Sequence, residues 1–477
     1  MTATTQPLTA QQLDRAVGAV LGSAAGDALG SQYEFGEPLP DDRAVEFGIG
    51  TFGHARGEWT DDTSMAMPLL QALAAGESLT GPVVLGRIAG EWLDWSRTAR
   101  DVGAQTSRAL SAMAERTEQA ARAAAQAVHE AYQQSAGNGS LMRTGPLALG
   151  YLGEGRQPAL VEAASRVAQL THWEPDNADA CALWSLAIRH AVLTGELDLA
   201  GQLVWLPEQW RQRWAELIVE AQRPGVHPRE FRADNGWVVA AFQAAIAAVT
   251  GASTLVEALE RAVRGGRDTD TVAAITGSLA GAVHGGTAVP VPWLRILHGW
   301  PGLRASDFTR LAVLAARGGT GDGHGWPLAA REPVYADELH RHPHDEGVWL
   351  GTIAALDRLA TDAPEVDAVI SLCRVGSAQV PEGVESVQVW LIDQPGRNLN
   401  LEHTLRGTAE LIAQLRAEGR HVLVHCAEAR SRTAAVATAY AALHRGIRID
   451  QAWTDIAATL PGFAPQPFLR EAVNALS

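Results

Sequence analysis

The stretch HVLVHCAEARSRT, His421–Thr433, joins two patterns that together predict an α/β fold. Its first five residues have the composition of a buried strand, and the apolar spacing of Ser431–Arg445 is that of a helix. Between them, five residues separate Cys426 from Arg432. The N–H groups of such a loop and the positive end of the next helix form a site for an anion. The same field favours the thiolate form of Cys426.

Strands and helices alternate before this stretch as well. Strand patterns occupy Val366–Leu372 and Val384–Ile392, and helical patterns occupy Leu350–Thr361 and Leu401–Glu418. This alternation indicates a small α/β domain with a mainly parallel central sheet, which we assign to residues 333–477. We expect its opening strand and turn within VWLGTIAAL, Val348–Leu356.

Two polar stretches flank the start of this domain. The glycine-rich segment Gly318–Pro333 predicts a linker, assigned to residues 318–332. The run HRHPHDE, His340–Glu346, offers metal-ligand residue types, but no partner motif frames it. A solvated surface segment is therefore the expected structure.

The chain before residue 318 has another period. Apolar residues recur at three- and four-residue spacing in an alanine-rich background, with glycine and proline joints between the segments. This pattern predicts an all-α domain over residues 1–317, with helices that include Val83–Ser96, Ala120–Gln134, Ala178–Leu193 and Trp237–Val249.

Composition restricts the partners and the compartment. The 477 residues carry a formal net charge of −16 and include no lysine, which argues against binding to nucleic acid or to an anionic membrane. Cys181, Cys373 and Cys426 give no disulfide framework, and the first residues lack the basic start of a signal peptide. We therefore expect a cytoplasmic protein with no membrane span.

Two acidic runs stand out in the helical region, WTDDTS at Trp59–Ser64 and GGRDTDT at Gly265–Thr271. Oxygen-only ligand sets of this kind suit hard divalent cations rather than zinc. Acidic runs are also common as helix caps or solvated turns, so the spacing alone leaves both interpretations open. The candidate metal ligands are Thr60, Asp61, Asp62, Asp268, Asp270 and Thr271.

Leu13 to Arg317 resembles the ADP-ribosylglycohydrolase family, which includes the dinitrogenase reductase-activating glycohydrolases. The motifs that carry the resemblance occur in the family's order: GSAAGDALGSQYEF, WTDDTSMA, RDVGAQT, GNGSLMR, THWEPDNADA and GGRDTDTVAAITGSLAGA. The resemblance implies an all-helical fold in which those six ligands hold two Mg²⁺ or Mn²⁺ ions beside the distal ribose. Its expected substrate is an ADP-ribosylated protein or a small-molecule ADP-ribose conjugate.

The resemblance also implies roles for individual residues. Glu34 matches a flap glutamate, Asp61 is a catalytic candidate as well as a ligand, and Asp101 matches a residue near the cleaved linkage. The diphosphate and ribose would lie against Gly137, Asn138, Gly139, Ser140 and His172. Some members place an aromatic residue before this glycine-asparagine loop to stack the adenine, whereas this chain has Ala136.

The C-terminal domain resembles the cysteine-dependent phosphatases of the tyrosine and dual-specificity type. Cys426, Arg432 and Thr433 match the signature, and Asp393 lies 33 residues before the cysteine, where the family places an acid. The resemblance implies a cysteinyl-phosphate intermediate, no cofactor, and a phosphorylated protein or small phosphate as substrate. Many members have glycine where this chain has Ala429, which puts the loop geometry and the rate in question.

The two resemblances together predict a bifunctional hydrolase that cleaves an ADP-ribosyl bond and a phosphate monoester. One alternative is that a domain, most readily the phosphatase-like one, binds its ligand without turnover. Another is that the helical domain cleaves a different glycoside. The linkage, the physiological metal, the coupling between the domains and the oligomeric state stay open.

Overall fold

The computed structural model describes residues 7–132, 135–322, 325–327, 336–359, 365–376 and 379–476. The chain divides into two compact units. The first comprises Met1–Val289 with Ile296–Thr320, and the second comprises Pro290–Arg295 with Gly321–Ser477. Each unit has its own core.

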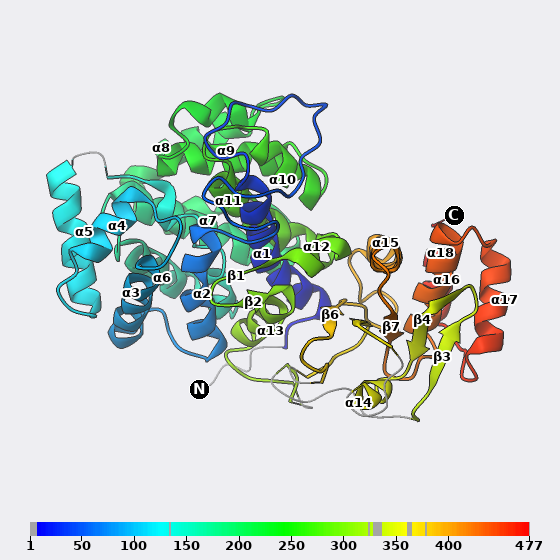
Figure 1. The fold of residues 1–477 in the computed structure, drawn as a ribbon. Helices are drawn as coiled ribbons and strands as arrows, with labels where there is room; N and C mark the ends of the chain where they lie inside the picture. Colours follow the sequence, from blue (N-terminus) through cyan, green and yellow to red (C-terminus); the bar gives the residue numbers. More distant parts are fainter. Residues whose placement is uncertain are drawn as a thin grey trace. The chain divides into compact units, whose positions relative to one another are not determined.

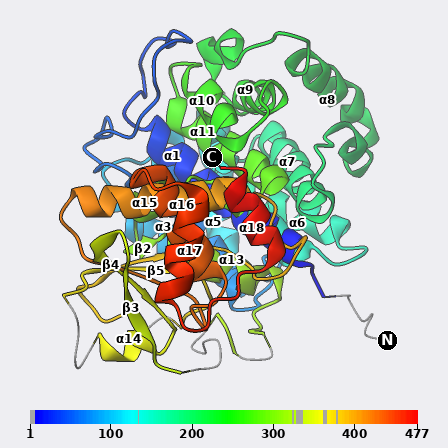
Figure 2. The same cartoon turned by 90° about the vertical axis from the view of Figure 1, so that its right-hand side faces the viewer.

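Helices form the first unit, as predicted (Figures 1 and 2). Its α-helices are α1 (Ala10–Gly30), α2 (Asp61–Ala74), α3 (Pro82–Ser96), α4 (Ala104–Ser111), α5 (Glu118–Tyr132), α6 (Gln157–Ala168), α7 (Pro175–Thr194), α8 (Glu208–Ala221), α9 (Val238–Thr250), α10 (Leu255–Val263), α11 (Thr269–His284) and α13 (Ala305–Ala316). Short 3-10 turns join several of them: η1 (Asn138–Ser140), η2 (Leu147–Tyr151), η3 (Ala200–Trp205), η4 (Pro228–Asp234) and η5 (Gly286–Ala288). A two-stranded pair, β1 (His298–Gly299) with β2 (Leu303–Arg304), was not predicted, and α12 (Val291–Ile296) lies at the division between the units.

Helices α1 and α11 lie side by side at the centre of this unit (Figures 1 and 2). Glycines every four residues along α1 form a stripe without side chains, and α11 meets it with glycines of its own. A Cβ added to Gly277 would lie 2.0 Å from the carbonyl oxygen of Gly22, and one on Gly281 would lie 1.9 Å from that of Gly18. The two backbones are therefore in direct contact.

The second unit contains a five-stranded sheet in the order β3-β4-β7-β5-β6. Its strands are β3 (Leu339–His342), β4 (Asp345–Gly351), β5 (Ala368–Ser371), β6 (Glu385–Gln388) and β7 (Val422–His425). The pairs β4–β7, β7–β5 and β5–β6 are parallel, and β3–β4 is antiparallel. The sheet is therefore mixed. The prediction of a mainly parallel sheet did not include the antiparallel edge strand β3.

The predicted solvated segment His340–Glu346 is instead the hairpin that joins β3 to β4. His342 is 2% exposed, and its Nε2 lies 3.1 Å from the carbonyl oxygen of Ala437. Asp345 accepts hydrogen bonds from Tyr440 and Arg416. Arg341, Pro343 and Glu346 are exposed as predicted. The surface prediction was wrong for His342 and Asp345, which find buried partners in distant helices that local spacing does not reveal.

The helices of the second unit are α14 (Ala355–Arg358), α15 (Leu401–Ala417), α16 (Arg432–His444), α17 (Ile449–Thr459) and α18 (Pro467–Asn474). The predicted helix at Leu350–Thr361 is reduced to α14, and its last two positions lie outside the described residues. Helices α17 and α18 were not predicted. Trp326, from the predicted linker, is 6% exposed and its ring lies 6.2 Å from that of Trp390, so this part of the stretch is packed structure.

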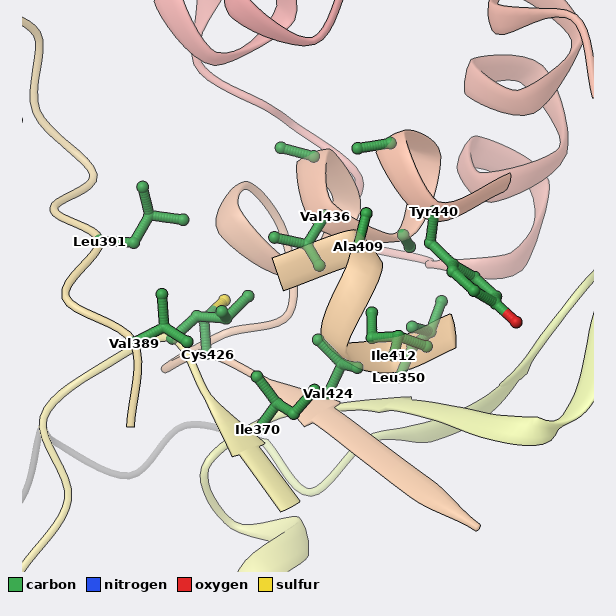
Figure 3. Packing of buried hydrophobic residues seen from close by; sticks show 14 of the residues in the cluster. Leu350, Ile370, Val389, Leu391, Ala409, Ile412, Val424, Cys426, Val436 and Tyr440 are labelled. Atoms are coloured by element: carbon green, nitrogen blue, oxygen red, sulfur yellow. The ribbon is translucent and has the colours of Figure 1, made fainter. Parts of the chain in front are cut away.

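Strand and helix side chains together build the core of the second unit (Figure 3). Helix α16 contacts β4 and β7, and α15 contacts β7. Val424 and Ile370 from the strands, Ile412 and Val436 from the helices, and Cys426 and Val389 all belong to this cluster. The central strand β7 thus ends at the cysteine inside a packed core.

Among the described residues, no helix combines the length and the apolar character that crossing a membrane requires.

We expect Gly277→Ala to destabilise the first unit by about 3 kcal/mol, because the new methyl group would force two backbones apart. The loss would run against helix propensity, which favours alanine over glycine by about 1 kcal/mol. Calorimetric unfolding of the full chain measures the change. Gly236→Ala, where an added Cβ meets nothing within 4 Å, is the matched control. Equal stability of the two variants would contradict the contact.

Candidate active sites

Carboxyl groups from separate segments meet at the ends of α1, α2 and α11. Asp27 lies near the end of α1, Asp61 and Asp62 open α2, and Asp268 caps α11. The direct contact between α1 and α11 sets this arrangement, since a Cβ on Gly30 would lie 2.5 Å from the Cα of Asp270. The full set is Asp27, Glu34, Asp61, Asp62, Asp101, Asp268 and Asp270.

Asp27 joins α1 to the start of α2. Its Oδ1 accepts from the N–H and the hydroxyl of Thr60, at 2.9 and 2.8 Å, and its Oδ2 accepts from the N–H of Thr63 at 3.0 Å. The Thr60 hydroxyl also lies 3.0 Å from Oδ2 of Asp62. A hydroxyl has one hydrogen and cannot donate to both carboxylates at once. When the hydroxyl donates to Asp27, Oδ2 of Asp62 loses this donor; when it donates to Asp62, Oδ1 of Asp27 keeps the Thr60 N–H.

Two groups of oxygens are close enough to hold metal ions. Carboxylate oxygens of Asp27, Asp62 and Asp270 lie within 4.8 Å of one another, and so do those of Glu34, Asp101 and Asp270. Asp270 belongs to both groups. Of the predicted ligands, the structure thus brings Asp62 and Asp270 together, and Thr60 touches both Asp27 and Asp62.

The remaining predicted ligands surround these groups. Asp61 Oδ2 accepts from the N–H of Gly103 at 3.3 Å, which ties the start of α2 to the loop that carries Asp101. Asp268 Oδ2 accepts from Asn138 Nδ2 at 2.7 Å. Thr271 is buried in the first turn of α11.

Glu34 is held beside the start of α11 by a backbone pair. The N–H of Phe35 donates to the carbonyl of Arg267 at 2.7 Å, and the N–H of Arg267 donates to the carbonyl of Gly36 at 2.8 Å. Phe35 and Arg267 both have left-handed backbones, with φ of 63° and 64°. Strain of this kind persists where surrounding contacts fix it, and here it lies next to Glu34 and Asp268.

Burial raises the pKa values throughout this cluster, and like charges add to the effect. The pKa of Asp61 rises to about 8 and that of Asp101 to about 6, in each case through burial first and neighbouring carboxylates second. Burial and the charge of Asp101 raise the pKa of Glu34 to about 9. The pKa values of Asp62 and Asp270 lie well above their usual range for the same reasons.

The chemistry of this donor set fits two hard cations. Asp62 Oδ1 is buried and finds no hydrogen-bond partner within the part of the chain that the structure describes. The cluster has raised pKa values, a threonine hydroxyl between two carboxylates, and only oxygen donors. Divalent cations with oxygen ligands would satisfy all three features.

The glycine-asparagine loop has a different internal structure from the one expected. The N–H of Gly137 donates to Gln105 and that of Asn138 to the carbonyl of Gly236, at 3.1 and 3.0 Å. Ser140 is fully buried, with its Oγ accepting from Asn177 at 2.7 Å. Two of the four expected amides are therefore used inside the protein. Those of Gly139 and Ser140 lie within the 3-10 turn η1, whose first amides lack intrahelical acceptors.

The ring of His172 packs against Gly137 and Gly139 of this loop. It is 1% exposed, its Nδ1 lies 2.7 Å from the Thr171 hydroxyl, and its ring lies 3.1 Å from where a Cβ of Gly139 would be. Burial lowers its pKa well below the usual value, so the ring is neutral. A side chain at position 139 would therefore crowd the histidine ring.

Asp27 is the residue that the ligand prediction missed. Its sequence signal was a single acid inside an otherwise small and apolar helix, in the GD pair of GSAAGDALG. A fully buried charge at such a position needs partners, which Thr60 and Thr63 supply from across the fold.

The second site lies where β7 ends. Cys426 follows that strand, is 2% exposed, and begins the loop that leads into α16. His425 before it is fully buried, with Nε2 at 2.7 Å from the Ser371 hydroxyl on the neighbouring strand. Burial lowers the pKa of His425 to about 4, so this histidine is a neutral support rather than a cation.

Arg432 opens α16 and turns back across the sheet. Its Nη1 donates to the carbonyl of Leu372 at 2.8 Å and to that of Leu391 at 3.3 Å. These contacts hold the guanidinium at the carboxyl edge of β5, one strand away from Cys426. The Thr433 hydroxyl is fully buried and has no hydrogen-bond partner among the residues described.

Asp393 reaches the same loop from the segment after β6. Its Oδ1 accepts from the hydroxyl of Ser431 at 2.7 Å. The structure therefore brings Cys426, Arg432, Thr433 and Asp393 to one edge of the sheet, with the acid bonded to the loop.

Ala429 confirms the local strain that its position suggested. Its φ is 57°, in the left-handed region, and it is 1% exposed. A residue with a Cβ costs about 1–2 kcal/mol in this conformation. The loop keeps the geometry that glycine would adopt freely, at the expense of stability.

Removing divalent cations should make the first unit sensitive to alkaline pH. The raised pKa values mean that the folded state holds protons that the unfolded chain releases above its ordinary carboxyl value of 3.8. Stability is therefore lost as the pH rises through about 6, 8 and 9, the values for Asp101, Asp61 and Glu34. In EDTA, calorimetry should show a lower unfolding temperature at about pH 8.5 than at about pH 5.5.

Added Mg²⁺ or Mn²⁺ should restore most of that loss, and the transition of the second unit should not respond to the metal. An EDTA-treated first unit that is as stable at the alkaline as at the acidic pH would contradict the charge cluster.

Ala429→Gly should raise the free energy of unfolding of the second unit by about 1 kcal/mol, because glycine adopts a positive φ without strain. Ala427→Gly is the control in the same loop, where φ is not positive and the loss of a Cβ should not stabilise. Calorimetry of the full chain compares the two. A stabilisation by Ala427→Gly equal to that by Ala429→Gly would show that strain is not its source.

Comparison with known proteins matches one family to each of the two parts of the chain. Residues 8–323 match the ADP-ribosylglycohydrolase family, and residues 348–474 match the catalytic domain of dual specificity phosphatases. ADP-ribosylarginine hydrolase Tri1 of Pseudomonas putida (strain GB-1) is 31% identical over 295 residues, which are 60% of this chain and 74% of that protein. Human dual specificity phosphatase 28 is 36% identical over 104 residues, 21% of this chain and 58% of that protein.

A solved structure described as an ADP-ribosylglycohydrolase-related protein complex matches with a TM-score of 0.50 and 30% identity. The match covers 65% of this chain and 99% of the other. The chain is therefore a hydrolase of the ADP-ribosylglycohydrolase family, joined to a second domain of the dual specificity phosphatase type.

Proposed function

We propose that the first unit hydrolyses an ADP-ribosyl glycosidic bond with the help of two divalent cations, Mg²⁺ or Mn²⁺. The observation that supports this most strongly is that Asp270 belongs to two clusters of carboxylates, one with Asp27 and Asp62 and the other with Glu34 and Asp101. The relatives are named as hydrolases of ADP-ribosyl linkages, and Tri1 as a hydrolase of ADP-ribosylarginine. Arginine-linked ADP-ribose is therefore the first substrate to test.

The cations would be held by Thr60, Asp61, Asp62, Asp268, Asp270 and Thr271, and Asp27 would join them directly or through Thr60. When bound, they would supply Lewis-acid chemistry to the ribose hydroxyls and to water. Asn138 keeps one oxygen of Asp268 in place by its hydrogen bond.

Carboxylates of the chain would assist cleavage of the glycosidic bond. Cleavage develops positive charge on the anomeric carbon, which a carboxylate beside it stabilises. Glu34 and Asp101 lie together on the more exposed side of the cluster and are the candidates for this contact. Burial and neighbouring carboxylates raise the pKa of Glu34 to about 9, so it would accept a proton from water only after bound cations had neutralised those charges and lowered its pKa.

Trp237 is our candidate for the surface that stacks the adenine. The sequence has Ala136 where relatives place an aromatic, yet Trp237 pairs with Gly137 in an antiparallel bridge and is 41% exposed. The N–H of Val238 donates to the carbonyl of Ala136 at 2.8 Å, which keeps the tryptophan beside the glycine-asparagine loop. Base stacking of this kind contributes about 1–3 kcal/mol.

We further propose that the second unit hydrolyses phosphate monoesters through a cysteinyl-phosphate. The Cys426 sulfur attacks phosphorus while Asp393 gives its proton to the leaving oxygen, and Arg432 binds the phosphate oxygens. Water then attacks phosphorus, Asp393 takes its proton, and the unpartnered Thr433 hydroxyl donates to the departing sulfur. The bonded pair of Ser431 and Asp393 favours turnover over binding alone.

The first test is release of ADP-ribose from arginine- and serine-linked substrates by the full chain with Mg²⁺ or Mn²⁺. Asp270→Asn should reduce release at least about 100-fold, because it removes the carboxylate shared by both groups. Glu216→Gln, on the outer face of α8, is the control for loss of one negative charge and should retain full activity.

In the same assay Trp237→Ala should raise KM about tenfold and leave kcat nearly unchanged, since stacking binds ground state and transition state alike. No release from either linkage by the metal-loaded wild type would direct the assay to other glycosides. An unchanged KM would reject Trp237 as the stacking residue.

A further inference from the structure

The hydroxyl of Ser431 is fixed on both sides. It donates to Asp393 Oδ1 at 2.7 Å and accepts from the N–H of Gln466 at 3.1 Å. A hydroxyl has one hydrogen, and the amide of Gln466 can only donate. The hydrogen of Ser431 is therefore directed at the carboxylate of Asp393. Ser431 is 6% exposed, so water competes weakly for this bond.

Two hydrogen bonds between Asn398 and Ile392 close the segment that carries Asp393. The side-chain amide of Asn398 accepts from the N–H of Ile392 and donates to its carbonyl, both at 2.8 Å. This pair of bonds closes the turn from Ile392 to Asn398 in the manner of two paired strands. Backbone and side chain of Asp393 are thus restrained independently, one by Asn398 and the other by Ser431.

The loop that carries Ser431 is itself braced. Arg430 Nε donates to the carbonyl of Gly462, and the N–H of Ala464 donates to the carbonyl of Arg430, both at 3.0 Å. Gln466 then precedes α18, whose Leu469 and Val473 are buried in the core of the unit. The position of Ser431 is therefore set by the packing of α18 as well as by its own loop.

We propose that Ser431 is a positioning residue for the general acid Asp393, an inference that rests on the proposed phosphatase function. Its hydrogen bond occupies Oδ1, which leaves Oδ2 to carry the proton to the leaving oxygen. When phosphorus binds the Cys426 sulfur and the ester bond breaks, that proton leaves from Oδ2, and the Ser431 bond stabilises the carboxylate that remains. The same oxygen takes the proton back from the attacking water. The acid is in place before substrate binds, because Asn398 and Ser431 already hold it.

Leaving-group dependence tests this role. A general acid matters for an ester whose leaving group is a poor one and matters little for a good one. Ser431→Ala in the full chain should lower kcat/KM for phenyl phosphate about tenfold or more and change kcat/KM for p-nitrophenyl phosphate less than about twofold, because kcat/KM reports the steps up to departure of the leaving group. Ser431→Thr keeps the hydroxyl and should restore phenyl phosphate turnover. Retained turnover of p-nitrophenyl phosphate shows that Ser431→Ala folds.

A double-mutant cycle separates positioning from general damage to the loop. In the Asp393→Asn background, Ser431→Ala should reduce phenyl phosphate turnover no further, since both changes remove one function. Thr454→Ala removes a comparable hydroxyl bond on α17 and should not alter the ratio of the two substrates.

Equal losses with both substrates, or additive losses in the cycle, would overturn the positioning role. A wild-type chain that hydrolyses neither ester would overturn the phosphatase function and this inference together.

Discussion

Direct backbone contact between α1 and α11 is the constraint on which the larger site depends. Glycines at 18, 22 and 26 of α1 leave no room for side chains against α11, and Gly30 rests on Asp270. This packing holds several carboxyl groups near one another although their mutual repulsion opposes it. Because Asp27 lies one turn before Gly30 and binds the start of α2, the same contact also places Asp61 and Asp62.

Both sites lie where helices begin and where the backbone is strained. Asp268 and Thr60 cap α11 and α2, and the cysteine loop leads into α16. Among the described residues other than glycine, positive φ occurs at Phe35, Arg267 and Ala429, each within three residues of a proposed functional side chain. Hydrogen bonds around these positions hold the strained backbone, so the orientation of the neighbouring functional groups is fixed before substrate arrives.

Much of this molecule could be predicted because the information is local. The acidic runs bring together Asp62 and Asp270, and the spacing from Cys426 to Arg432 places both at one sheet edge. The long helices follow from their apolar period. The strained position at Ala429 was located through the resemblance to phosphatases, many of which have glycine there, and its φ is positive.

The features that sequence reasoning missed depend on contacts between distant segments. Asp27 accepts a hydrogen bond from Thr60, 33 residues away. The buried His342 contacts the carbonyl of Ala437 on α16, 95 residues away. The Ser140 side chain is buried and accepts a hydrogen bond from Asn177, a partner that local sequence did not indicate. In each case a polar residue has a partner that only the tertiary fold supplies, and local pattern cannot distinguish it from a solvated one.

The hydroxyl of Thr60 between two carboxylates has a consequence for how the first unit responds to its surroundings. This hydroxyl has one hydrogen for the carboxylates of Asp27 and Asp62, so protons and the proposed cations would compete for the same oxygens. If the proposed cations bind here, their binding would release protons to the buffer, and a lower pH would weaken their binding.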